Sequence, residues 1–245
     1  MNQKGGVGKT TTTMNLAHAF ARMNKEVLAI DLDPQSHLTA GLGELEKFQV
    51  GIDEVLIDGE KISNVTHNTR DHLDLLPAGE HLGELENSTK EGSQRGYKLR
   101  NVIREQVTNK DIVLIDCPPS SGILGMNALL AANEILIPVS GDFLALQGLS
   151  RLITTFRHID NILKLKTKKW VVLTRFHARR RLAQEVRSKI LGYFPDSVLN
   201  TAIRETVALA ESPGFGQSIF EYQASSNGAK DYQSLAEDMI NCNVH

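Results

Sequence analysis

Short apolar runs that alternate with amphipathic helical patterns constrain this chain more than any other feature. The runs are almost continuously apolar, which is typical of strands buried on both faces of a parallel sheet. They are Val27–Asp31, Leu73–Leu76, Ile112–Asp116, 135–139 and 170–174. The patterns between them predict helices over 10–23, 97–107, 144–165, 182–193 and 227–240. This alternation predicts an α/β fold, a doubly wound and mostly parallel sheet flanked by helices.

Length and composition limit the remaining possibilities. No repeat or low-complexity linker interrupts the chain, so residues 1–245 are predicted to form a single domain. The net charge of −2 argues against wholesale polyanion binding but leaves room for a local basic patch. Two cysteines, Cys117 and Cys242, are too few for a disulfide scaffold or a four-ligand zinc site, and they suit a reducing cytoplasm.

The segment 4–10 (KGGVGKT) directly precedes the first predicted helix. Its glycines allow the backbone to curl, so that several N–H groups point at one anion, and the helix N-terminus adds a partial positive charge. Lys9 is placed to meet β and γ phosphates, and the Thr10 hydroxyl is placed to ligate Mg²⁺. The predicted nucleotide-binding residues are Gly5, Gly6, Val7, Gly8, Lys9, Thr10 and Thr11.

Two acidic motifs follow predicted strands. Asp33 lies in the string DLDPQ, and Asp116 lies in the string IDCPPS. Because the carboxyl ends of parallel strands meet at one edge of a sheet, both acids are expected beside the phosphate loop. Each acid alone could be a turn residue or a helix cap, but the ordered set of three motifs favours a nucleotide site.

The loop departs from the general P-loop pattern, since Gln3 replaces the first glycine and a second lysine, Lys4, lies inside it. With this lysine the segment resembles the deviant Walker A loop of the ParA/MinD family of ATPases, closest to the ParA-type partition ATPases. The resemblance covers about residues 2–240. It implies that Lys4 reaches the nucleotide of a second copy, that Asp33 positions the attacking water and that Asp116 holds Mg²⁺ through water.

The resemblance therefore implies ATP and Mg²⁺ as cofactors and an ATP-bound homodimer. The implied catalytic residues are Lys4, Lys9 and Asp33, and the implied metal residues are Thr10, Asp33 and Asp116. ATP is favoured over GTP because the nearest string to a guanine-binding motif, Asn109-Lys110-Asp111, has the wrong spacing and precedes its strand. Near the base, where relatives commonly have Pro-Arg-Asn, this chain has Arg204-Glu205-Thr206.

Residues 164–204 hold eleven basic side chains against two acidic ones, a local charge of +9. Such a surface can follow phosphates without reading bases, although a solvated face is the alternative. In ParA-like relatives one DNA-binding arginine aligns with Arg179, and a second aligns with the position that is Ala208 here. The predicted DNA-binding residues are Arg175, Arg179, Arg180 and Arg181.

These features predict a ParA-like ATPase for plasmid or chromosome partitioning, located in the cytoplasm on the nucleoid. The ATP-bound sandwich dimer is expected to bind DNA non-specifically. A ParB-like centromere-binding protein or a cargo adaptor is expected to stimulate slow hydrolysis and release the dimer. Positioning of a protein cargo is an open alternative. A MinD-like membrane cycle is disfavoured, because residues 229–245 contain one lysine and three acids. A metabolic enzyme that uses the loop for phosphoryl transfer is a further alternative, whereas an iron–sulfur reductase is disfavoured by the positions of Cys117 and Cys242.

The strand that should lead into the loop is missing from the sequence. Only Met1, Asn2 and Gln3 precede Lys4, whereas a central strand has about five or six residues. Losing this strand would leave a gap in the middle of the sheet, with unpaired backbone groups on both neighbouring strands. We expect the chain to be an N-terminally truncated version of a longer product, in which Met1 is an internal residue.

Overall fold

The computed structural model describes residues 6–44, 50–87, 93–119, 122–141, 153–154, 157, 161 and 167–245. Lys4, Gly5 and most of the helix predicted over 144–165 lie outside these residues. The strands are β1 (Val27–Asp31), β2 (His67–Arg70), β3 (Leu73–Leu76), β4 (Ile112–Asp116), β5 (Glu134–Ser140) and β6 (Lys168–Thr174).

The helices lie before, between and after these strands. They are α1 (Lys9–Arg22), α2 (His37–Gly41), α3 (Ile52–Ile57), α4 (Ile62–Val65), α5 (Leu82–Asn87), α6 (Lys98–Gln106), α7 (Ile123–Ala131), α9 (Arg181–Tyr193), α10 (Val207–Glu211), α11 (Ile219–Tyr222) and α12 (Asn227–Asn241), with short 3₁₀ helices η1 (Ser93–Tyr97) and η2 (Ser212–Phe215). None of these helices combines the length and apolar character needed to cross a membrane. The α/β prediction is confirmed.

The strands form two sheets in the described part of the chain. One has the order β2-β3-β1-β4, in which β1 runs parallel to both β3 and β4 while β2 pairs antiparallel at the edge. The other consists of β5 and β6, paired in parallel over their whole length. The polar strand β2 was not predicted.

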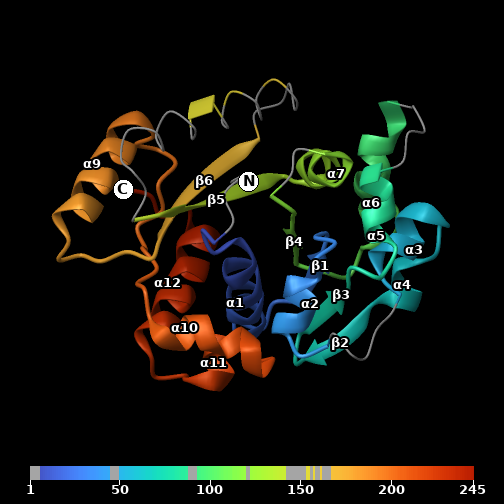
Figure 1. The fold of residues 1–245 in the computed structure, drawn as a ribbon, viewed down its shortest axis with the longest axis horizontal. Helices are drawn as coiled ribbons and strands as arrows, with labels where there is room; N and C mark the ends of the chain where they lie inside the picture. Colours follow the sequence, from blue (N-terminus) through green and yellow to red (C-terminus); the bar gives the residue numbers. More distant parts are fainter. Residues whose placement is uncertain are drawn as a thin grey trace.

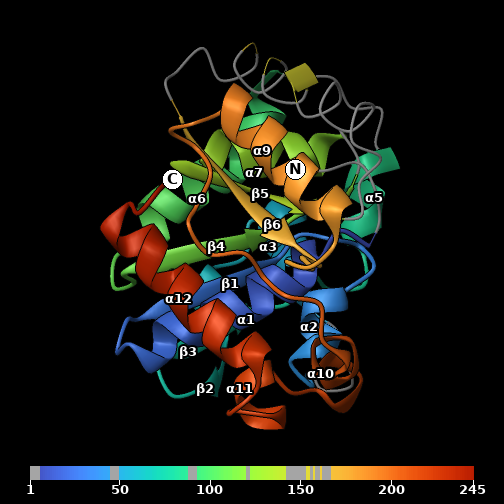
Figure 2. The same ribbon diagram turned by 90° about the vertical axis from the view of Figure 1, so that its left-hand side faces the viewer.

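Helices cover both faces of the four-stranded sheet (Figures 1 and 2). Val27 and Ala29 of β1 pack with α1, α10, α11 and α12, whereas Leu28 and Ile30 pack with α3 to α7 on the other face. This alternation follows from the two-residue period of a strand. Trp170 and Val172 of β6 join the first of these cores, so one apolar layer extends under both sheets.

Helix α1 connects the two sheets, because it contacts both β4 and β5. The Thr12 hydroxyl is 3.2 Å from the Tyr232 hydroxyl of α12, in a buried position. The Asn15 side-chain oxygen accepts a hydrogen bond of 2.7 Å from the backbone N–H of Ile219. Through these contacts the helix behind the glycine loop is fixed to the C-terminal helices.

Among the described residues, β4 pairs only with β1, and β5 pairs only with β6. In this part of the chain, β4 and β5 therefore each have one edge without a strand partner. The side chains of Ile112 to Ile115 are accordingly only half-buried, although β1 beside them is fully buried.

An apolar strand supplied ahead of residue 1 should pair with these edges. We expect a fusion of six alternating valines and isoleucines to raise the midpoint of thermal unfolding by about 5 °C or more, because it would satisfy backbone groups and bury β4. A Gly-Ser extension of equal length is the control. An equal rise with the control, or no rise with the apolar segment, would contradict this prediction.

Candidate nucleotide site

The glycine loop has the backbone geometry of an anion cradle. Gly6 and Gly8 have φ angles of 79° and 87°, in the left-handed region that favours glycine. Gly8 is the N-cap of α1, which has no side-chain cap and no acidic residue in its first turn. The backbone amides and the partial positive charge at this helix end are therefore directed at whatever the loop binds.

The loop is also anchored from outside. Val7 is buried, and its carbonyl oxygen accepts a hydrogen bond of 2.9 Å from the Thr174 hydroxyl at the end of β6. Lys9 is the first residue of α1, and its charge helps to lower the pKa of Asp116. These contacts place the predicted residues 6–11 together at the carboxyl edge of both sheets; the predicted Lys4 and Gly5 lie outside the described residues.

Two acids end neighbouring strands at this edge. Parallel register places Asp31 of β1 opposite Asp116 of β4. Asp116 is only 1% exposed, and its Oδ1 atom accepts a hydrogen bond of 3.4 Å from the Thr13 hydroxyl. The Thr10 hydroxyl also donates to this carboxylate. The Oδ2 atom is buried and has no hydrogen-bond partner among the described residues.

Burial, together with the charge of the nearby Asp31 carboxylate, raises the pKa of Asp116 to about 7, whereas the hydrogen bond from Thr10 opposes the shift. A buried carboxylate oxygen without a donor, next to further carboxylates, is a position that a cation would stabilise. Mg²⁺ fits these groups, because it binds through one or two carboxylates together with phosphate oxygens and water. The described residues contain no group of three or more His, Cys, Asp or Glu side chains that could hold a metal ion. The carboxylates at this edge would therefore hold Mg²⁺ together with phosphate oxygens and water.

Asp33 lies in the loop that follows β1 and is 7% exposed. Its Oδ1 atom accepts a hydrogen bond of 3.0 Å from the backbone N–H of Gln35, which closes a tight turn. The structure thus brings Lys9, Thr10, Asp33 and Asp116 to one edge of the fold.

Sequence reasoning missed the role of Asp31. This residue is completely buried, and burial raises the pKa of its carboxyl group. Its carboxylate accepts hydrogen bonds from Asp33, in the loop that follows β1, and from Thr39 in α2. The sequence does contain a signal for this role, because Asp31 ends an otherwise apolar, buried strand. A buried carboxylate at such a position needs hydrogen-bond donors from the protein.

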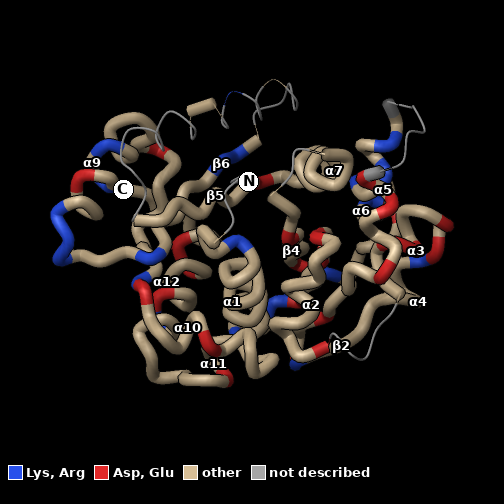
Figure 3. Tube along the Cα trace, in the orientation of Figure 1, with Lys and Arg blue, Asp and Glu red and all other residues tan. Residues whose placement is uncertain are grey.

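The predicted DNA-binding residues lie on the connection from β6 into α9, where Figure 3 shows basic positions along the chain. Arg179, Arg180 and Arg181 are exposed at the N-terminus of α9. Arg181 is 94% exposed on its side chain and pairs at 3.0 Å with Glu185. Arg175 is half-exposed and lies 3.7 Å from the Glu205 carboxylate.

Arg204 differs from the others in the basic segment. Its guanidinium group makes hydrogen bonds of 2.5 to 3.1 Å with both carboxylate oxygens of Asp231 in α12. This pairing compensates its charge, so we exclude Arg204 from the basic surface. Its neighbours are engaged as well, since Glu205 accepts a hydrogen bond of 2.6 Å from His177 and Thr206 caps α10.

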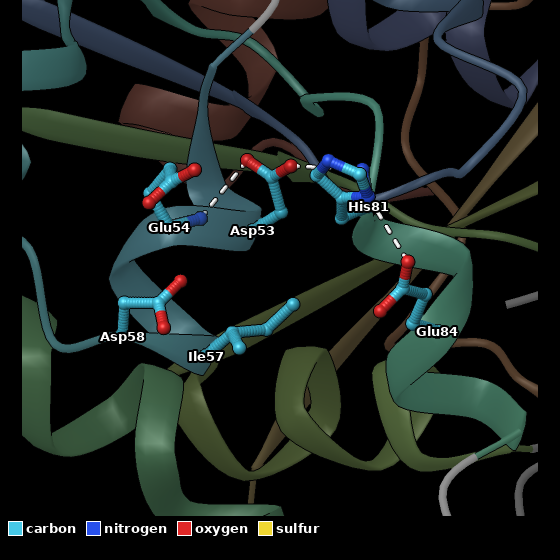
Figure 4. Close-up of a pocket in the computed structure, with 6 residues that line it drawn as sticks. All are labelled: Asp53, Glu54, Ile57, Asp58, His81 and Glu84. Atoms are coloured by element: carbon cyan, nitrogen blue, oxygen red, sulfur yellow. Dashed lines mark hydrogen bonds and ion pairs between the residues drawn. The ribbon is translucent and has the colours of Figure 1, made fainter.

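A hollow of about 360 Å³ lies between α3 and α5, and Figure 4 shows its lining. The lining residues are Asp53, Glu54, Ile57, Asp58, His81 and Glu84. The Asp53 carboxylate accepts hydrogen bonds of 2.9 Å from the amides of Gly51, Glu54 and His81, so it holds the local backbone in place. Acidic walls would repel phosphate groups, and we therefore assign the nucleotide to the glycine loop and not to this hollow.

A glycine loop opening a helix, with two buried acids at neighbouring strand ends, defines a P-loop nucleotide-binding protein. A family model for the AAA domain matches residues 1–169. The sporulation initiation inhibitor protein Soj of Bacillus subtilis (strain 168) is 38% identical, over 97% of this chain and 95% of its own. The chromosome partitioning protein ParA of Myxococcus xanthus (strain DK1622) is 36% identical, over 98% of this chain and 86% of its own. The chain belongs to the ParA/Soj family of chromosome-partitioning ATPases.

A solved structure with the same fold contains a bound nucleotide and a metal ion. It is the crystal structure of cobyrinic acid a,c-diamide synthase from Mycobacterium smegmatis with bound ADP and magnesium. The two chains are 29% identical, with a TM-score of 0.82, over 98% of this chain and 92% of that chain.

The burial of Asp116 predicts a conflict between stability and metal binding. In the ligand-free protein its folded pKa of about 7 lies above the unfolded value, so the folded state holds the proton more tightly. Its contribution to the free energy of unfolding is therefore present at low pH and is lost as the pH rises to about 7. The stability of Asp116→Asn relative to the wild type should therefore rise with pH, by about 1 to 3 kcal/mol between pH 5 and pH 8.

Denaturant unfolding of both proteins across this pH range, without nucleotide or metal, measures the difference. The variant should at the same time lose Mg²⁺-dependent nucleotide affinity. A stability difference that does not change with pH, or one that falls as the pH rises, would show that the carboxylate is not under this strain.

Proposed function

We propose that this chain binds ATP with Mg²⁺ and hydrolyses it slowly to ADP and phosphate, as a nucleotide switch in DNA partitioning. The observation that carries the nucleotide site is the buried Asp116 Oδ2 atom beside the glycine loop, which lacks a partner among the described residues. The family membership supports the partitioning role. The ADP and magnesium bound by the synthase of the same fold support the cofactors.

The residues of the loop have separate tasks in this proposal. The amides of residues 6–11 and the N-terminus of α1 bind the phosphates, and Lys9 compensates charge on the β and γ groups. Asp33 orients the attacking water, and Thr10 and Asp116 hold the metal. Bound Mg²⁺ offsets the negative charge of the phosphate oxygens and of the three neighbouring aspartates.

Hydrolysis is coupled to dimer formation by Lys4, which the family resemblance assigns to the nucleotide of the partner copy. A cation that arrives only when two copies meet stabilises charge on the transferring phosphoryl group in the dimer alone. The ATP-bound form is thus a sandwich dimer, and the ADP-bound form is a monomer.

The ATP dimer binds DNA non-specifically through Arg175, Arg179, Arg180 and Arg181. The exposed arginines at the start of α9 support this step, because exposed guanidinium groups can contact phosphates without reading bases. A ParB-like centromere-binding protein or a cargo adaptor stimulates hydrolysis and releases the dimer. The protein then cycles on the nucleoid in the cytoplasm, carrying a plasmid or a chromosomal origin.

Two variants test the hydrolytic site. Asp33→Asn should lower kcat by about a hundredfold or more while the ATP dissociation constant stays within about threefold, because water orientation is lost but the phosphate cradle remains. Lys9→Ala should lose measurable ATP binding. Phosphate release and ATP titration measure these effects. An Asp33→Asn protein that turns over at the wild-type rate would remove Asp33 from the reaction.

A double charge reversal tests the DNA surface. Arg179→Glu/Arg181→Glu should weaken ATP-dependent DNA binding by about a hundredfold or more at moderate salt, because phosphate contacts supply most of non-specific affinity. ATP affinity should be unchanged. Filter retention of a random duplex with ATP, with ADP and without nucleotide is the measurement.

The matched control is Lys61→Glu/Arg104→Glu, which changes the charge equally at exposed positions of the α4 and α6 region. This region lies on the opposite side of the molecule from α9 (Figure 1). Equal losses in both double variants would indicate a net-charge effect, and unchanged retention in the first would show that the arginines are only solvated.

A further inference from the structure

The carboxylate of Asp31 is committed to the loop that carries Asp33. Its Oδ1 atom accepts a hydrogen bond of 3.2 Å from the backbone N–H of Asp33. Its Oδ2 atom accepts two hydrogen bonds of 2.8 Å, from the backbone N–H and from the hydroxyl of Thr39. Asp31 and Thr39 are 0% and 2% exposed, so water does not compete for these bonds.

Helix α2 depends on this carboxylate for its first turn. Ser36 occupies the N-cap with a left-handed φ of 54°, and its side chain makes no cap hydrogen bond. Thr39 is the third helical residue. An N-cap side chain would normally accept a hydrogen bond from the backbone N–H at this position. Asp31 replaces that missing acceptor from the end of β1, so the strand itself caps the helix that follows it.

The far end of α2 is fixed independently. The Arg70 guanidinium group donates to the carbonyl oxygen of Leu42 at 3.2 Å and to that of Gly216 at 3.0 Å. The Glu221 carboxylate in turn pairs with Arg70 at 3.0 Å. The segment 32–36 therefore connects β1 to α2, whose far end is held in place. The hydrogen bonds of Asp31 determine the distance between the end of β1 and the first turn of α2.

We propose that Asp31 and Thr39 are a positioning pair that holds Asp33 where it can orient the attacking water. This inference rests on the proposed role of Asp33 in hydrolysis. Neither residue touches the nucleotide in this scheme, because all the hydrogen bonds of Asp31 end on the segment 33–39. The Thr39 hydroxyl gives the Oδ2 atom of the buried carboxylate a second hydrogen bond, which restricts the segment more than the Thr39 amide alone.

Thr39→Val tests the pair, since valine keeps the shape and the backbone N–H but removes the hydroxyl. We expect kcat to fall between about tenfold and a hundredfold, because small displacements of a reacting group reduce the rate strongly. The ATP dissociation constant and KM should stay within about twofold. Thr39→Ser, which restores the hydroxyl, should turn over within about threefold of the wild type.

The control is Thr66→Val, which removes a comparable hydroxyl whose hydrogen bond of 2.8 Å goes to the carbonyl oxygen of Ile62, in another helix. It should leave kcat unchanged. Wild-type kcat in Thr39→Val would overturn the proposal, and so would a loss of ATP affinity in parallel with kcat, which indicates a merely structural role. If Thr39→Val does not fold, Thr39→Ser decides, because a tenfold loss there would assign the effect to the methyl group.

The Asp33→Asn protein separates this proposal from the one on which it rests. If Asp33→Asn is inactive while Thr39→Val is fully active, only the positioning pair is wrong. If Asp33→Asn retains wild-type kcat, the hydrolytic role of Asp33 is itself wrong.

Discussion

The close approach of three aspartates at the carboxyl edge of the sheet is the interaction on which the rest of the structure depends. Parallel pairing of β1 and β4 forces Asp31 and Asp116 to end side by side, and Asp33 follows two residues later. The fold offsets part of their repulsion with threonine hydroxyls, backbone amides and the positive end of α1. What remains is a site with excess negative charge, which a bound Mg²⁺ ion would offset.

The same site is linked to distant surfaces through few contacts. Thr174 donates to the carbonyl oxygen of Val7 in the glycine loop, and the next residue, Arg175, begins the basic segment. Helix α1 carries the loop at one end and contacts Tyr232 and Ile219 along its length. A change at the loop can therefore reach both the basic segment and the C-terminal helices through contacts that connect them directly to the loop.

Local chemistry explains which features the sequence could predict. The strands Val27–Asp31, Leu73–Leu76 and Ile112–Asp116 were predicted with their bounds because buried parallel strands are continuously apolar. The edge strand His67–Arg70 was missed, since it is polar and pairs antiparallel with a register shift. The pairing of Arg204 with Asp231 joins residues in different elements, and a charge count along the chain cannot detect that kind of compensation. The role of Asp31 cannot be read from its motif, because its hydrogen-bond donors come from the fold of the following loop and helix.

The most direct measurement is sedimentation velocity of the Asp33→Asn protein with ATP and Mg²⁺, with ATP and a chelator, with ADP and Mg²⁺, and without nucleotide. A dimer is expected only with ATP and Mg²⁺ together, since closure is proposed to need both a triphosphate for Lys4 of the second copy and a cation to compensate Asp116. A monomer under that condition, or a dimer that forms irrespective of nucleotide and metal, would contradict the proposed switch.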